Sequence, residues 1–100
     1  MHLLVIGYDH PGEAGRLRRE RARERHLAQA DNPGPARPVF RAAVLDDDGA
    51  VIGSMLVMEA ASRDDLDAWL RVEPYAVDDV WHEVRIHPCQ VPAAFRQPNM

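Results

Sequence analysis

Residues 39–60 have the sequence VFRAAVLDDDGAVIGSMLVMEA. The two ends of this stretch, residues 39–45 and 51–60, are rich in β-forming side chains. The five residues between them include Asp48-Gly49, a pair typical of tight hairpin turns. We therefore expect the middle of the chain to form two antiparallel strands joined by a short turn.

A strand and a helix are predicted on the N-terminal side of this hairpin. Residues 2–8 are apolar almost throughout, as in a central strand that is covered on both faces. Residues 13–30 contain mainly good helix formers, but their apolar stripe is poor, so one face of the helix is expected to be wet or to line a cleft. The three prolines and one glycine of residues 31–38 predict a loop before the hairpin.

A helix and a strand are predicted on the C-terminal side. Ser62 is expected to cap the helix by accepting a hydrogen bond from the backbone of Asp65, and Pro74 is expected to end it. Residues 80–87 alternate between apolar and polar side chains, which indicates a half-buried strand whose core face carries Val80, Val84 and Ile86. Residues 89–100 have no periodic pattern and are expected to form an extended or disordered tail after a single domain of residues 1–88.

The order of these elements, β-α-β-β-α-β, is that of a ferredoxin-like α+β fold. Right-handed crossovers place the first and third strands at the centre of a four-stranded antiparallel sheet, with the second and fourth strands at its edges. Two helices cover only one face of such a sheet. We expect a second copy of the chain to cover the other face, giving a homodimer with a dimeric α+β barrel.

The composition excludes several classes of function. Hydrophobic residues make up 46% and charged residues 28% of the chain, as in ordinary globular domains. The apolar opening is too short to span a membrane, and the single cysteine, Cys89, fits a reducing cytoplasm. Residues 12–26 hold six arginines, yet the pI is about 5.6 and no aromatic side chains interleave with them, so nucleic-acid binding is not expected.

No metal and no cofactor are expected from the sequence. Asp46, Asp47 and Asp48 belong to the predicted turn, and no glutamate follows them at the spacing of a calcium loop. His82 and His87 are five residues apart on a predicted strand and therefore point to opposite faces of the sheet.

Several short motifs follow one another along residues 3–88. In chain order they are Tyr8-Asp9, Arg23-x-x-His26-Leu27-Ala28, Asp48-Gly49, Gly53-Ser54, Ala61-Ser62, Trp69, Glu73-Pro74-Tyr75 and Val84-x-Ile86-x-Pro88. In this order and spacing the chain resembles the YCII-related domain family, whose members are small dimeric proteins with a ferredoxin-like fold. The resemblance implies a pocket at the end of the first strand, containing a histidine and an aspartate that have been proposed as a catalytic pair. Some members of the family are dehydrochlorinase-like lyases that act on hydroxylated aromatic rings.

The residues that correspond to this pair are His26 and Asp9. His26 shares a helical face with Arg19 and Arg23, which favours a neutral ring able to accept a proton, and this face is not expected to belong to the core. Asp9 follows the first strand, where its carboxylate can orient the imidazole of a general base. The structural alternatives are a solvated helix histidine and an aspartate that caps a turn.

Four side chains are candidates for substrate binding. Guanidinium groups would hold an anionic or phenolic substrate and hydroxyl groups would hydrogen-bond to it, and the candidates are Arg19, Arg23, Ser54 and Tyr75. Each also has an ordinary structural explanation, because arginines on helices are usually solvated and such hydroxyls usually stabilise the fold.

Two functions from different classes are compatible with these residues. The first is a cofactor-independent lyase or isomerase that acts on hydroxylated or halogenated cyclic or aromatic compounds, with His26 as its general base and Asp9 orienting it. The second is a non-catalytic dimeric module that binds a small-molecule ligand or assembles with a partner. Two departures from the family pattern favour the module: residues 40–43 are Phe-Arg-Ala-Ala where members usually have Ala-Gly-Pro, and Glu73 replaces the usual aspartate.

Overall fold

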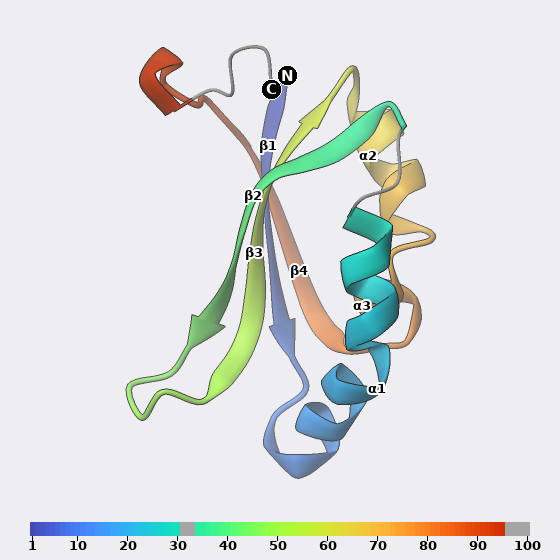
Figure 1. Ribbon diagram of the computed structural model, residues 1–100, viewed down its shortest axis with the longest axis vertical. Helices are drawn as coiled ribbons and strands as arrows, with labels where there is room; N and C mark the ends of the chain where they lie inside the picture. Colours follow the sequence, from blue (N-terminus) through green and yellow to red (C-terminus); the bar gives the residue numbers. More distant parts are fainter. Residues whose placement is uncertain (31–33, 96–100) are drawn as a thin grey trace.

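The computed structural model describes residues 1–30 and 34–95 of the chain. Its elements in chain order are β1 (His2–Asp9), α1 (Gly12–Ala30), β2 (Ala36–Leu45), β3 (Val51–Ala60), α2 (Arg63–Leu70), α3 (Pro74–Val77), β4 (Trp81–Cys89) and a 3-10 turn at Ala93–Phe95. The strands form one antiparallel sheet in the order β2-β3-β1-β4, and the α-helices lie on one side of it (Figure 1). The predicted ferredoxin-like fold, with the first and third strands at the centre, is therefore confirmed.

The turn between β2 and β3 is organised by Asp46. Its backbone carbonyl accepts a hydrogen bond from the Gly49 N–H at 3.0 Å, and its carboxylate accepts from the N–H groups of Asp48 and Ala50, both at 2.9 Å. Gly49 has a φ of 87°, a left-handed conformation that costs glycine little. The hairpin predicted from Asp48-Gly49 is formed.

Two strands extend beyond their predicted bounds. β2 begins at Ala36 rather than at Val39, so the last three residues of the predicted loop pair with β3. β4 runs through Pro88 to Cys89 instead of ending before the proline. Pro38 and Pro88 are tolerated because β2 and β4 are the edge strands of the sheet. An edge strand has no neighbour on its outer side, so a missing N–H there costs no hydrogen bond between strands.

A β-bulge in β2 changes which side chains face the helices. The register with β3 shifts between Pro38 and Phe40, so that Arg37 lies opposite Glu59 but Arg41 lies opposite Leu56. Residues directly opposite each other in an antiparallel pair share a face of the sheet. Arg41 therefore lies on the same face as the buried Leu56, whereas Arg37 lies on the other face.

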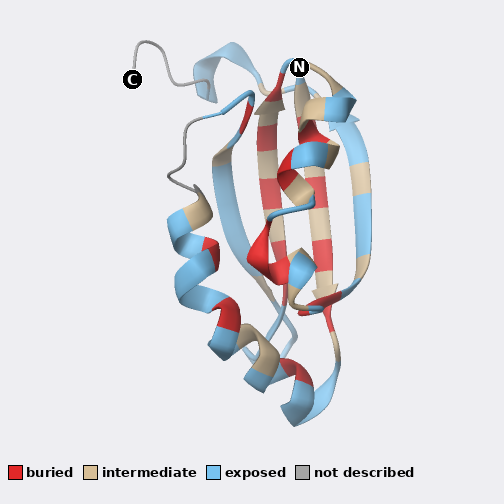
Figure 2. Cartoon of the chain, turned by 90° about the vertical axis from the view of Figure 1, so that its right-hand side faces the viewer, coloured by how far each residue is buried: buried red, intermediate tan, exposed pale blue. Residues whose placement is uncertain are grey.

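The core lies between the sheet and the helices. Every second residue of β1 and β3 is buried on this side, as the alternating colours in Figure 2 show. The largest of these buried side chains are Leu3, Val5, Leu56 and Met58. α2 closes the core with Leu66 and Trp69, and Ser62 caps it as predicted by accepting from the Asp65 N–H at 3.1 Å.

On the opposite face of the sheet the described residues form no helix. Leu4, Ile6 and Tyr8 are only half-buried there. Phe40, which lies opposite Val57 on the same face, is 61% exposed. This is the face for which a second copy of the chain was predicted.

Part of the predicted loop and part of the predicted tail, residues 31–33 and 96–100, lie outside the described residues. Within the described part of the tail, Ala93–Phe95 form the single 3-10 turn. Over the described ranges, no helix is long and apolar enough to cross a membrane.

Candidate active site

The buried face of α1 carries the candidate histidine. Ala22 is fully buried and His26 is 6% exposed, whereas Arg23 between them remains exposed. The expectation that this face does not belong to the core is therefore wrong for His26. The physical reason is that α3, which the sequence pattern did not predict, brings polar and aromatic groups against α1.

Glu73 is the carboxylate that contacts His26. It is fully buried, and its Oε1 pairs with Nδ1 of His26 and also accepts the Tyr75 backbone N–H at 3.1 Å as the N-cap of α3. A carboxylate beside Nδ1 favours the tautomer that carries its proton there. The other ring nitrogen, Nε2, has no hydrogen-bond partner in residues 1–30 and 34–95, and this tautomer leaves its lone pair available.

Tyr75 fixes the plane of the imidazole. The two rings are parallel within 6° and their centroids are 3.8 Å apart. Trp81 packs edge-on against both, at 6.5 Å from His26 and 5.8 Å from Tyr75. Trp81 in turn lies directly on Gly7 of β1, where a Cβ atom would overlap the indole. His26 is thus held by an aromatic cluster that rests on the central strand.

Arg19 forms the second polar unit of the site. Its Nε and Nη2 donate to the two carboxylate oxygens of Asp9 at 2.5 and 2.9 Å, and Nη2 also donates to Ser54 Oγ at 2.7 Å. Burial acts to lower the pKa of Arg19, but the hydrogen bonds and charge of Asp9 outweigh it and raise that pKa above its ordinary value. The guanidinium carbon lies 4.6 Å from the centroid of the Tyr75 ring.

Asp9 and His26, which were expected to form a pair, have different partners. Asp9 is bound by Arg19 and His26 by Glu73. Arg19 precedes His26 by seven residues, which is about 10 Å along a helix. The carboxylate at the end of β1 meets α1 at the level of Arg19, and Tyr75 lies between the two polar units.

A pocket of about 230 Å³ lies next to His26. Its polar lining includes every candidate residue except Asp9, which lines a larger hollow, and one residue that was not predicted, Arg41. The candidates in the lining are Arg19, Arg23, His26, Ser54 and Tyr75. Burial raises the pKa of the Tyr75 hydroxyl, and the nearby charges of Arg19 and Arg23 only partly oppose this. The phenol is therefore protonated at neutral pH and able to donate a hydrogen bond into the pocket.

A larger hollow of about 770 Å³ lies near the end of β1, between the β2–β3 turn and the start of β4. It contains His10 and His82, whose ring centroids are 5.3 Å apart, but neither is buried. His10 also has a carboxylate partner, Asp79, but that side chain is 62% exposed. We place the candidate active site in the smaller pocket, because there both the histidine and the carboxylate that orients it are buried.

The family model of the YCII-related domain matches residues 1–90. The chain belongs to the YCII-related domain family. This confirms the resemblance inferred from the motifs of residues 3–88. A comparison of this YCII-related domain with curated proteins found no significant match.

The YCII-related domain is also similar to a solved structure. That structure is a 5-chloro-2-hydroxyhydroquinone dehydrochlorinase from Burkholderia phenoliruptrix in complex with 2,5-dihydroxybenzoquinone. The TM-score is 0.67 at 22% sequence identity, and the alignment covers 94% of this chain and 98% of that chain. At this level of identity the likeness establishes the fold alone.

Sequence reasoning missed two residues of this site, Glu73 and Arg41. Glu73 precedes Pro74, and a carboxylate before a proline is a common way to begin a helix, so the short α3 had a local signal. Arg41 had none, because its orientation depends on the bulge in β2.

Proposed function

We propose that this YCII-related domain is a cofactor-independent enzyme of lyase or isomerase type, with His26 as its general base. The observation that carries the proposal is the buried pairing of His26 Nδ1 with Glu73, next to a small pocket. A carboxylate–imidazole pair of this kind leaves Nε2 free to accept a proton and stabilises the imidazolium that results.

The charges around the pocket fit such a proton transfer. Removing a proton from a substrate leaves negative charge on it, and Arg19, held rigidly by Asp9, presents a fixed positive charge to the same pocket. The Tyr75 phenol adds a neutral donor. Asp9 therefore acts as a positioning residue for Arg19 in this proposal, and Glu73 has the orienting role first expected of Asp9.

The proposed substrates are hydroxylated or halogenated rings. The support is the family membership and the similar dehydrochlorinase, whose name specifies a chlorinated hydroxyhydroquinone. His26 would take a proton from a ring hydroxyl and return it to a ring carbon, which shifts a double bond and gives the keto isomer. Where that carbon carries a halogen, loss of a second hydroxyl proton would then expel halide and leave a quinone, so that HX is lost overall. The reaction needs no electron acceptor in either case.

The test is turnover of a panel of hydroxylated and halogenated aromatic compounds. We expect His26→Ala to lower any detected kcat by about 10²- to 10⁴-fold, the usual contribution of a positioned base. His82→Ala is the matched control, because His82 is exposed and lines the larger hollow but not the pocket that contains His26. Activity that survives His26→Ala, or that is lost equally in His82→Ala, places the chemistry elsewhere.

The second candidate is a ligand-binding module without catalysis. It is favoured by Asp9, both of whose carboxylate oxygens are already bound by Arg19 rather than open to a substrate. Thermal-shift measurements with the same compounds distinguish the two candidates. Ligand binding with no turnover, unchanged in a variant that lacks both Asp9 and His26, supports the module.

We also propose that the chain is a homodimer in the cytoplasm, formed through the open face of its sheet. Phe40, at 61% exposure, lies opposite the apolar Val57 on this face, and Leu4 and Ile6 are only half-buried. Light scattering on a sizing column should give twice the chain mass, and Phe40→Asp should shift it toward the monomer. Leu45→Asp, an equally apolar and exposed position at the end of β2, is the control. A monomeric native chain contradicts this proposal.

A further inference from the structure

Two arginines of the pocket have no acidic partner in the described part of the chain. Arg19 is ion-paired with Asp9, but no carboxylate lies within ion-pair distance of Arg23 or Arg41 in residues 1–30 and 34–95. Both line the pocket that contains His26. The pocket therefore has an excess of positive charge that the described part of the protein does not compensate.

The two arginines approach the pocket from different elements. Arg23 comes from α1 and Arg41 from the edge strand β2. If the register of Arg37 with Glu59 continued without the bulge, Arg41 would lie opposite Met55 on the open face of the sheet. The bulge turns Arg41 toward α1 and brings a second guanidinium without an acidic partner to the pocket, at the cost of one unpaired strand residue.

The size of the pocket limits its occupant. Its volume of about 230 Å³ is below the roughly 300–1,000 Å³ of pockets that bind drug-sized ligands. A single substituted ring therefore fits it better than a larger metabolite. Guanidinium groups bind planar oxyanions through two parallel hydrogen bonds, a geometry that a carboxylate matches and a neutral phenol does not.

We propose that the ligand of this pocket is a single-ring compound that carries a carboxylate, and that Arg23 and Arg41 bind this carboxylate from opposite sides while a ring hydroxyl faces His26. The inference rests on the proposed function, since it names the substrate class of the same site. In this proposal Arg41 determines which substrates bind. Arg19 has a different role, because its charge faces the reacting part of the ring.

The test compares two ligands that differ by the carboxylate, 2,5-dihydroxybenzoate and hydroquinone, by titration calorimetry. The native chain should bind the carboxylate at least tenfold more tightly, and Arg41→Gln should weaken that binding by about tenfold while leaving hydroquinone unchanged. Arg41→Lys, which keeps the charge but loses the planar fork, should give an intermediate affinity. Arg21→Gln is the matched control, because Arg21 is exposed on α1 about 200° around the helix from Arg23.

Three results would each overturn this proposal. They are equal affinities for the two ligands, an unchanged affinity in Arg41→Gln, and no measurable binding of 2,5-dihydroxybenzoate. An equal loss in Arg21→Gln would also count against it, because the effect would then be one of net charge. Binding is measured without turnover, so a chain that binds the carboxylate through Arg41 but transforms no ring would contradict the proposed enzyme and leave this inference standing.

Discussion

The ring of Tyr75 is stacked on that of His26, 3.8 Å away and parallel within 6°, and the guanidinium of Arg19 lies 4.6 Å from the same ring. His26 and Arg19 are two turns apart on α1, so Tyr75 lies between them. One aromatic side chain from a four-residue helix thus sets the spacing of the two polar units of the site.

Replacing Tyr75 with alanine should destabilise the fold strongly. Tyr75 is 2% exposed, and removal of a large buried aromatic side chain costs about 3–5 kcal/mol. Tyr75→Phe keeps the ring and should lose less than about 1.5 kcal/mol. Urea unfolding followed by circular dichroism measures both values. Equal losses in the two variants would mean that the hydroxyl, and not the stacked ring, provides the stabilisation.

The raised pKa of Tyr75 predicts how stability depends on alkaline pH. Burial raises the pKa above the ordinary value of 10.0, so the unfolded chain loses this proton at lower pH than the folded chain. The contribution of Tyr75 to the free energy of unfolding is therefore fully present below the pKa of the unfolded chain, and it is lost as pH rises through the pKa of the folded chain. Absorbance titration of tyrosinate, native chain minus Tyr75→Phe, should show one group ionising above pH 10. A difference curve centred below that value contradicts the prediction.

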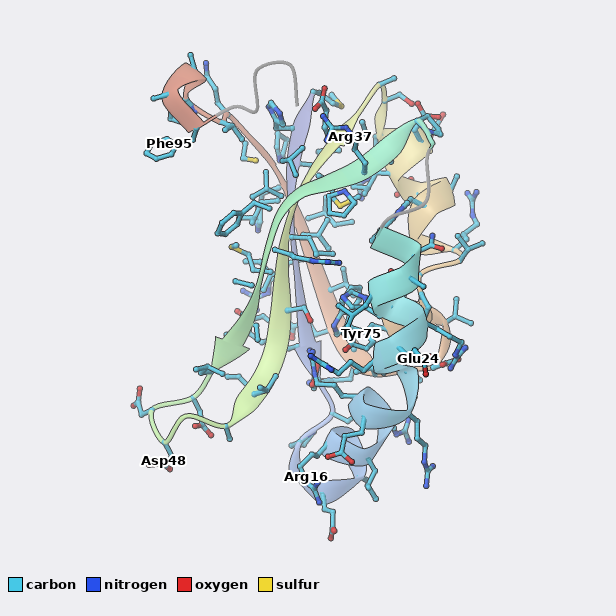
Figure 3. The ribbon with its side chains drawn as sticks, in the orientation of Figure 1. Arg16, Glu24, Arg37, Asp48, Tyr75 and Phe95 are labelled. Atoms are coloured by element: carbon cyan, nitrogen blue, oxygen red, sulfur yellow. The ribbon has the colours of Figure 1, made fainter. Side chains whose placement is uncertain are left out.

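Glu73 should be required both for folding and for any proton transfer. Glu73→Ala removes the cap of α3 and the partner of a buried histidine, and should cost about 3 kcal/mol. Glu73→Gln can still accept a hydrogen bond from the Tyr75 N–H, so it should be more stable than Glu73→Ala. Its kcat should fall while its KM stays unchanged. Glu24→Ala, at an exposed site on the same helix as His26 (Figure 3), should change stability by less than about 0.5 kcal/mol. A fully active Glu73→Gln enzyme would show that Glu73 only caps the helix.

A methyl group at Gly7 should disturb the site from the side of the central strand β1. The added Cβ would overlap the Trp81 ring, so the indole and the His26 and Tyr75 rings packed on it must move. We expect Gly7→Ala to lose about 1–3 kcal/mol, the range of overpacked cores. Gly34→Ala meets no atom within 4 Å and should be nearly neutral. Thermal unfolding compares the two, and equal melting temperatures would contradict the close packing of Trp81 on β1.

Much of the fold could be predicted because its signals are local. The Asp48-Gly49 turn and the Ser62 cap each depend on residues within a few positions of one another. The alternation predicted for the last strand is not seen in its burial, because Val84, expected on the core face, is 40% exposed. The strand order could then be inferred from the right-handed crossovers between strands.

The site was less predictable because its contacts join distant parts of the chain. His26 and Glu73 are 47 residues apart, and their contact requires α3, a helix too short to have a periodic pattern. Asp9 was correctly predicted to lie at the end of β1. Which residue of α1 it contacts depends on how the helix packs on the sheet, and that residue is Arg19 rather than His26. Arg41 depends on the bulge in β2, which no residue pattern indicated.

Because Glu73 both caps α3 and touches His26, the connection between α2 and α3 has a fixed length. Residues 71–73 are all that separate Leu70 from Pro74. One residue more or fewer would rotate the carboxylate away from the imidazole even if every element stayed folded. Insertions and deletions should therefore be rarer in this connection than in the β2–β3 turn, where an added residue changes only the tip of a hairpin far from the aromatic cluster.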